Sequence, residues 1–211
     1  MKAAIVSIAL PVALLGACAA HAEPPPTPLT DVFIHFCGDT RGDADSALQL
    51  ADAEEWSLAP KGMSGPSFGL GVVWIRRQGR WTHAHGVRRV LLVGMQRDQE
   101  GKDTLTCTVG EMMPSGMKAD VAGVQGALQK WVGTAPLRSS AVFGEFAYRE
   151  AHGLRIAVPP SQDPLANDAP RPPPDVAAVS FNYVLGAMLT ISYQRSHEGP
   201  VGRPLGSAQS P

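Results

Sequence analysis

The chain has 211 residues, with 18 basic and 19 acidic side chains and a formal net charge of −1 at neutral pH. This length suits one domain with a core of its own once a targeting segment has been set aside. The sequence shows no basic face of the kind that binds nucleic acid, so we expect no nucleic-acid partner.

Residues 1–22 have the pattern of an export signal. Lys2 supplies the positive charge, and the uncharged apolar run that follows is too short for a comfortable membrane span. Two processing sites remain open: a small-x-small site ends at Ala22, and the tetrapeptide LGAC resembles a bacterial lipobox in which Cys18 would be lipidated. Both routes predict a periplasmic or secreted protein, and the second anchors it to the outer membrane through Cys18.

Export would place the other two cysteines in an oxidising compartment. Besides Cys18, the sequence contains Cys37 and Cys107. Two cysteines in an oxidising compartment most simply pair, and the absence of a C-x-x-C motif argues against a redox site. We therefore predict a disulfide between Cys37 and Cys107 that closes a loop of about 70 residues.

The folded domain is predicted to span residues 31–195, after a Pro-rich linker at residues 23–30. It opens with an apolar run that ends at Cys37, and a polar elbow leads from there into an amphipathic helix. Asp43 or Asp45 is placed to cap this helix. Its apolar stripe follows a 3.6-residue period and consists of Ala44, Ala47, Leu48 and Ala51.

A second helix is predicted over residues 121–132. Its apolar residues recur with helical spacing behind Asp120, which is the expected cap, and Gly133 is expected to end the helix. Residues 159–174 hold seven prolines and are predicted to form a long surface loop. From Ser196 onward the composition predicts a disordered tail.

The rest of the pattern predicts antiparallel hairpins. Residues 78–79 are expected to form a turn, Gly101 to lie in a hairpin loop, and 176–194, which carries no charge, to form a hairpin rather than a membrane span. The clearest strand is 103–109, in which cysteine and aliphatic residues alternate with threonines. The strand candidates are residues 71–75, 87–95, 103–109, 140–149, 154–158 and the two halves of 176–194.

These elements predict one α+β domain, an antiparallel sheet of hairpins with two helices packed on one face. The pattern C-G-D-T-R-G-D-x-x-x-A-L-x-x-A, Trp56 and the later T-L-T-C-T-V resemble small exported bacterial proteins of uncharacterised families. The resemblance covers residues 31–135. It implies export, an N-terminal Cys-bearing helix, a later Cys-bearing strand and a disulfide, and it implies no activity.

Two short patterns in the sequence resemble catalytic or metal-binding motifs. Gly65 to Gly69 matches G-x-S-x-G around Ser67, but the strand before and the helix after that a nucleophile elbow needs are not predicted there. His83 and His85 would point to the same side of an extended segment, as two ligands of one metal ion do. The candidates for a third ligand are His35, Asp39 and His152, all distant in sequence.

Two functions remain open from the sequence. The first is a non-catalytic binding module of the cell envelope, which uses its sheet face or its Pro-rich loop to bind an unknown envelope protein or a small ligand. The alternative is a small metal-dependent hydrolase that uses His83, His85 and a carboxylate. The sequence shows no convergent acid–base constellation, which favours the binding module, and we expect no cofactor.

Overall fold

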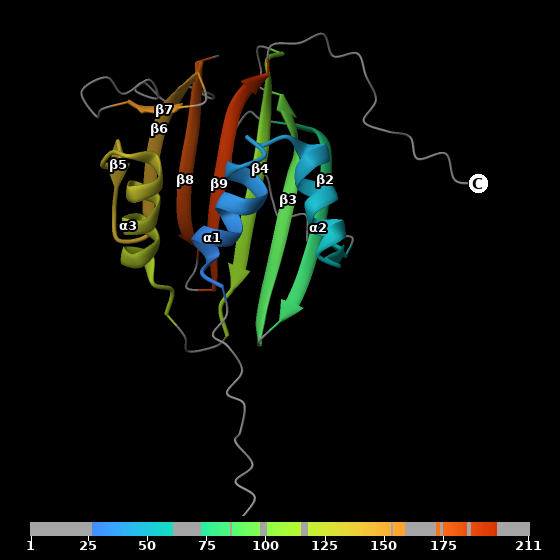
Figure 1. The fold of residues 1–211 in the computed structure, drawn as a ribbon. Coiled ribbons are helices and arrows are strands. Elements are labelled where there is room, and N and C mark those ends of the chain that lie inside the picture. The colour runs from blue at the N-terminus through green and yellow to red at the C-terminus, as the bar shows by residue number, and fades with distance from the viewer. Residues whose placement is uncertain are drawn as a thin grey trace, which may run out of the picture.

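The computed structural model describes residues 27–60, 73–84, 86–97, 101–114, 118–152, 154–158, 172–173, 175–184 and 187–197 (Figure 1). The predicted export signal with Cys18, Ser67 of the G-x-S-x-G match, and His85 lie outside these residues. So does most of the predicted Pro-rich loop.

The described strands form one antiparallel sheet of nine strands, in the order β1-β2-β3-β4-β9-β8-β6-β5, with β7 paired to β6. The predicted α+β class and the antiparallel sheet of hairpins are therefore confirmed. The C-terminal hairpin β8–β9 lies in the middle of the sheet, between β4 and β6. The strands are β1 (Ser57–Leu58), β2 (Val73–Ala84), β3 (Val87–Arg97), β4 (Asp103–Met112), β5 (Arg138–Ser139), β6 (Phe143–Ala151), β7 (Leu154–Ala157), β8 (Val176–Val184) and β9 (Met188–His197).

Figure 1 shows the helices in front of this sheet. They are α1 (Leu29–Phe33), which continues into the π-helix η1 (Ile34–Gly38), then α2 (Ala44–Ala53) and α3 (Val121–Val132). The prediction of two helices is therefore incomplete, because it lacks the segment α1–η1. The predicted linker 23–30 is also too long by two residues, since Leu29 and Thr30 already belong to α1 and are buried.

The caps of the predicted helices are confirmed. The Asp43 carboxylate accepts a hydrogen bond of 2.8 Å from the Ser46 N–H at the start of α2, so Asp43 and not Asp45 is the cap. At the start of α3, Asp120 accepts one of 2.9 Å from the Gly123 N–H. These bonds satisfy N–H groups that have no helical partner. The α2 stripe is buried as predicted.

The core lies between the helices and one face of the sheet. A row of register partners crosses this core face from β6 to β3, and each of its side chains is buried. The alternation of a strand places every second side chain on the same face, which fixes which residues meet the helices. The row consists of Phe146, Val179, Tyr193, Cys107 and Val93.

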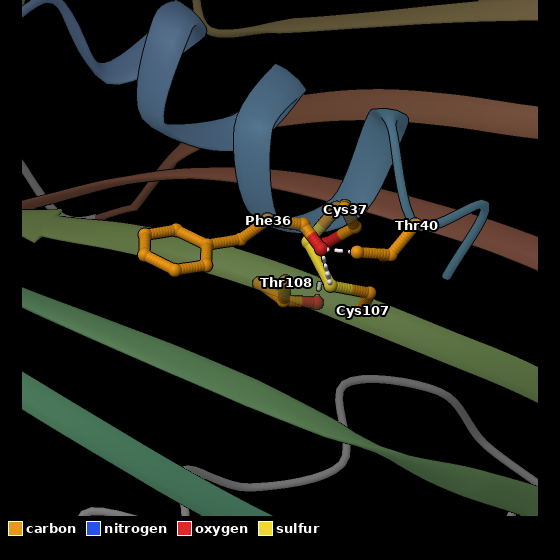
Figure 2. The surroundings of a disulfide bond; sticks show 6 residues. Phe36, Cys37, Thr40, Cys107 and Thr108 are labelled. Carbon is orange, nitrogen blue, oxygen red and sulfur yellow. Dashed lines mark hydrogen bonds between the residues drawn. A yellow bond between two sulfur atoms is a disulfide. The ribbon is translucent and has the colours of Figure 1, made fainter. Parts of the chain in front are cut away.

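The predicted disulfide is present. Cys37 of η1 and Cys107 of β4 are bonded, with an S–S distance of 2.01 Å and a Cα–Cα distance of 5.5 Å. Figure 2 shows the bond between helix and strand, with the Phe36 carbonyl beside it. That carbonyl accepts a hydrogen bond of 2.5 Å from the Thr40 hydroxyl. The disulfide therefore ties η1, and the chain that leaves it, to the centre of the sheet.

Two expectations about strand ends are wrong. Residues 78–79 do not turn, because Gly79 lies within β2 opposite Leu92, where an added Cβ would come within 2.8 Å of the Ala59 Cβ. The domain does not end at residue 195 either, because β9 runs to His197 and buries Ser196.

The uncharged run 176–194 forms the hairpin β8–β9, as predicted. Within the described residues, no helix combines the length and apolar character that a membrane crossing requires.

Candidate functional site

A polar pocket of about 320 Å³ lies at one end of the core face, and we call it the arginine pocket. Its walls come from the elbow between η1 and α2, the end of β6, the entry to β8, and β9. Sheet register brings these segments together, since Ala177 of β8 lies opposite Arg195 of β9. The lining residues are Arg41, Glu150, His152, Asp175, Ala177, Tyr193 and Arg195.

The disulfide positions the first of these side chains. The Gly42 N–H donates a hydrogen bond of 2.9 Å to the Cys37 carbonyl, so the elbow starts directly at the half-cystine. Gly42 packs against the ring of Tyr193 in β9. Arg41, just before it, reaches Glu150 at the end of β6, with 3.3 Å between Nε and Oε2. The elbow therefore holds a guanidinium at the rim of the pocket.

Backbone strain is concentrated at the same place. Outside glycine, positive φ angles occur in the described residues at Arg41 (54°), Glu55 (61°) and His152 (52°). Such conformations cost about 1–3 kcal/mol each and persist where the surroundings impose them, often at binding sites. Two of the three line the arginine pocket.

Two tyrosines are buried beside the pocket. Tyr193 lines it, Tyr148 lies in the next strand but one, and both side chains are fully buried. Neither hydroxyl makes a hydrogen bond of normal geometry with a described residue, although Tyr148 and Arg195 approach the Tyr193 hydroxyl, and Arg155 that of Tyr148, closely enough to lower these pKa values through weak hydrogen bonding. Burial raises the pKa of both side chains, and the nearby Glu150 carboxylate raises it further. Both phenols therefore remain protonated at neutral pH and are available as hydrogen-bond donors.

Guanidinium groups lie near these phenols as well. Arg195 lowers the pKa of Tyr193 and Arg155 that of Tyr148, but both act more weakly than burial. The Arg155 guanidinium also stacks over Trp131 of α3, 4.1 Å from the ring centroid. Trp131 in turn meets Tyr148 edge-on at 5.7 Å. This stack connects Tyr148 to α3.

The carboxylates of the pocket already have cationic partners. Glu150 is paired with Arg41, and Asp175 is paired with Arg149 at 2.7 Å. Arg195, in contrast, makes no ion pair with any described residue, although it is half-buried. Among the described side chains that line this pocket, the charge without an ionic partner is therefore positive.

Larger hollows exist, and in one of them two pairs of charged or polar side chains are bound to each other. One of about 560 Å³ lies between α1 and the hairpin β2–β3. In it, His35 is bound to Glu54 at 2.7 Å and Arg89 to Glu111 at 2.8 Å. None of the buried side-chain atoms that lack a partner belongs to its lining. Among the described residues, this hollow therefore has no buried, unpartnered polar side-chain atom that a ligand would satisfy.

The residues predicted to bind metal are not assembled by the described structure. His83 is exposed near the end of β2, in the register row that leads through Arg88 to Met112. His152 lines the arginine pocket at the opposite end of the sheet. His35 is held by Glu54. No group of three metal-ligating side chains converges within the described residues.

Sequence reasoning missed most of the arginine pocket. The alternation of β9 indicated that Tyr193 faces the core, but no local spacing connects it with Arg41 or Glu150. The sequence predicts His152 as a turn residue and as one candidate for a third metal ligand, but not as part of a pocket. A tyrosine and an arginine two residues apart on one strand face, Tyr193 and Arg195, are the signal that the sequence offered.

No family model matches the chain, and comparisons with curated proteins and with solved structures likewise found no match.

Proposed function

We propose that this protein is an exported binding module that holds a small ligand in the arginine pocket. The proposal depends on one observation: the Tyr193 hydroxyl is buried at the pocket and makes no hydrogen bond of normal geometry with a described residue, the approaches of Tyr148 and Arg195 being too weak to satisfy it. A buried polar group without a partner costs about 1–3 kcal/mol. An acceptor atom of a ligand in the pocket would remove this cost.

The chemistry of the pocket suits recognition better than catalysis. A phenol whose pKa is raised donates a hydrogen bond but does not abstract a proton at neutral pH. Glu150, the nearest carboxylate, is engaged by Arg41. The ring of Tyr193 is buried and packed against Gly42, so the phenol donor is held in place before a ligand arrives, which reduces the entropy cost of binding.

A thermal-shift screen of the wild type and Tyr193→Phe tests the proposal. The library should contain neutral, cationic and anionic small molecules in equal numbers. We expect at least one class to stabilise the wild type in a saturable manner, by about 2.7 kcal/mol at a hundredfold excess over Kd, and Tyr193→Phe less. Tyr183→Phe is the matched control, because Tyr183 does not line the pocket. A library without any saturable, Tyr193-dependent shift would contradict the proposal.

The cell-envelope location is the second part of the proposal. Its support is the N-terminal sequence, with the lipobox at Cys18 and the cleavage site at Ala22, and the buried Cys37–Cys107 disulfide is of the kind that persists in oxidising compartments. Expression of the full chain in a bacterium, followed by intact mass measurement and fatty-acid labelling, tests both routes. We expect a mature chain that starts at Glu23 or a lipidated chain that starts at Cys18. A full-length chain in the cytoplasm would refute export.

A further inference from the structure

We infer that the ligand of the arginine pocket carries an oxyanion, a carboxylate or a phosphoryl group, which Arg195 and the Tyr193 hydroxyl bind together. This inference rests on the proposed function and adds the chemical class of the ligand to it.

The charges around the pocket select an anion. Both carboxylates at the pocket are neutralised, Glu150 by Arg41 and Asp175 by Arg149, and Arg195 has no anionic partner among the described residues. A cationic ligand would have to displace an arginine from one of these pairs. An anion, in contrast, would meet a half-buried guanidinium, where charge-assisted hydrogen bonds are strongest.

The geometry of β9 places two donors side by side. Tyr193 and Arg195 are two positions apart on one strand, so their side chains project from the same face. The register partner of Arg195 on β8 is Ala177, whose small side chain lines the pocket and leaves the space above it open. A phenol O–H and a guanidinium N–H that flank an open space are suited to two oxygens of one anionic group.

The lining also limits the size and polarity of the ligand. A volume of about 320 Å³ is at the lower end of small-molecule sites. Apart from Ala177 and the ring of Tyr193, the lining side chains are charged or polar. The pocket therefore favours a compact polar molecule with few carbons over a lipid or an aromatic compound.

The rim supplies a third donor. Arg41 is 56% exposed, and its single contact with Glu150 is 3.3 Å long, so its side chain is able to turn toward an incoming anion. In that position the anion would compete with Glu150 for the Arg41 guanidinium.

Calorimetric titration with charged and uncharged probe pairs tests the inference. Succinate is compared with succinamide, glycerol 3-phosphate with glycerol, and inorganic phosphate is titrated alone. We expect at least one anion to bind the full-length mature protein, and its neutral counterpart to bind at least about tenfold more weakly. Binding of the carboxylate but not the phosphates identifies a carboxylic acid as the ligand class, and the reverse identifies a phosphoryl compound.

Variants connect the binding to the pocket. Arg195→Gln should weaken the anion at least about tenfold, whereas Arg195→Lys, which keeps the charge, should weaken it less. The matched control is Arg80→Gln. It removes the same charge from β2, where Arg80 is paired with Asp52 of α2, and should leave the affinity for the anion unchanged. If Arg195→Gln does not fold, Arg195→Lys and Tyr193→Phe still decide the test, because each keeps most of the side chain.

The outcomes separate this inference from the proposed function. Binding of neutral or cationic compounds that Tyr193→Phe weakens, with no preference for anions and no effect of Arg195→Gln, overturns the oxyanion and leaves the binding pocket standing. An anion that binds Arg80→Gln as weakly as Arg195→Gln reveals nonspecific electrostatics and also overturns it. If no compound of any charge binds, both the inference and the proposed function fail.

Discussion

Gly42 lies directly against the aromatic ring of Tyr193. A Cβ added to Gly42 would come within 2.5 Å of the Tyr193 Cδ1 and 2.6 Å of Cε1, and the φ angle of Gly42 is +71°. Both the space and the backbone conformation therefore require glycine at this position. Through this contact the elbow that carries Arg41 is seated on the strand that carries the candidate ligand donors.

Replacement of Gly42 by alanine should consequently lower the free energy of unfolding by about 1–3 kcal/mol, because backbone strain and the clash act together. Urea denaturation measures the change. Gly133→Ala is the matched control: its φ is +89° but nothing lies within 4 Å of an added Cβ, so it isolates the backbone term. Gly126→Ala, within α3, should raise stability by up to about 1 kcal/mol. Equal effects of Gly42→Ala and Gly133→Ala would refute the contact with Tyr193.

Removal of the disulfide should also lower the stability of the fold. Cys37 and Cys107 are both fully buried, and removal of a native disulfide typically costs about 2–5 kcal/mol. We expect Cys37→Ala to show this loss in urea denaturation. Thiol alkylation of the unfolded wild type, with and without reductant and followed by intact mass measurement, checks the bond itself. Alkylation of both thiols without reductant would show that the pair is reduced.

Alkaline pH should destabilise the protein through the two buried tyrosines. Tyr148 and Tyr193 have raised pKa values in the folded state, whereas tyrosines of the unfolded chain ionise near pH 10. The stabilisation of the folded state by these protonated tyrosines is complete below about pH 10. Above that pH the free energy of unfolding falls by about 1.4 kcal/mol per pH unit for each tyrosine. Denaturation curves between pH 8 and 11 measure the decline. Phenylalanine at both positions should remove most of it, and an unchanged decline would contradict the assignment.

Acid pH should weaken a different contact. The Asp103 side chain is 4% exposed, and its carboxylate accepts hydrogen bonds of 2.7 and 2.9 Å from Arg97. The Arg97 hydrogen bonds lower the pKa of Asp103, so the stabilisation is present above about pH 4 and is lost as the pH falls further.

Asp103→Asn should therefore lower the free energy of unfolding by about 1 kcal/mol at neutral pH, and this difference from the wild type should disappear in acid. Denaturation of wild type and variant over this pH range measures the difference. The control is Asp52→Asn, whose partner is Arg80 and whose carboxylate is 54% exposed, so that solvent screens the pair and the effect is smaller. A cost that does not change with pH would point to packing rather than charge.

The metal hypothesis for His83 and His85 has a test of its own. His83 is exposed, and surface substitutions usually change stability by no more than about 0.5 kcal/mol. We expect the double variant His83→Ala/His85→Ala to melt like the wild type, and both proteins to contain no metal when purified without added ions. Stoichiometric zinc that the double variant loses would favour the hydrolase over the binding module.

Local patterns predicted the elements whose stability is decided locally. The α2 stripe, the Asp43 and Asp120 caps and the Gly133 terminus each depend on residues within about one helical turn, so their spacing was sufficient. The same holds for the β8–β9 hairpin, because its alternating side chains indicate one buried face.

Tertiary contacts decided the features that sequence patterns did not show. The run from Val32 to Phe36 is rich in β-branched and aromatic residues, which favour strands, yet burial against the sheet makes it helical. Gly79 resembles a turn residue, but its neighbour Ala59 leaves no room for a side chain within β2. The arginine pocket depends on the register between strands that lie far apart in sequence, which no short window of sequence contains.

The position of β9 also determines when the sheet can be completed. β9 follows every other described strand in the sequence, yet it lies between β4 and β8 at the centre of the sheet. During folding the meander β2–β3–β4 can form early, but β6 cannot join it until β9 has paired with β4, so assembly depends on contacts of high sequence separation and is slow. Until then β4 is an edge strand, and Cys107 is accessible to an oxidant from the side that Tyr193 later covers. The order of assembly thus leaves a period in which the disulfide can form before the core closes over it.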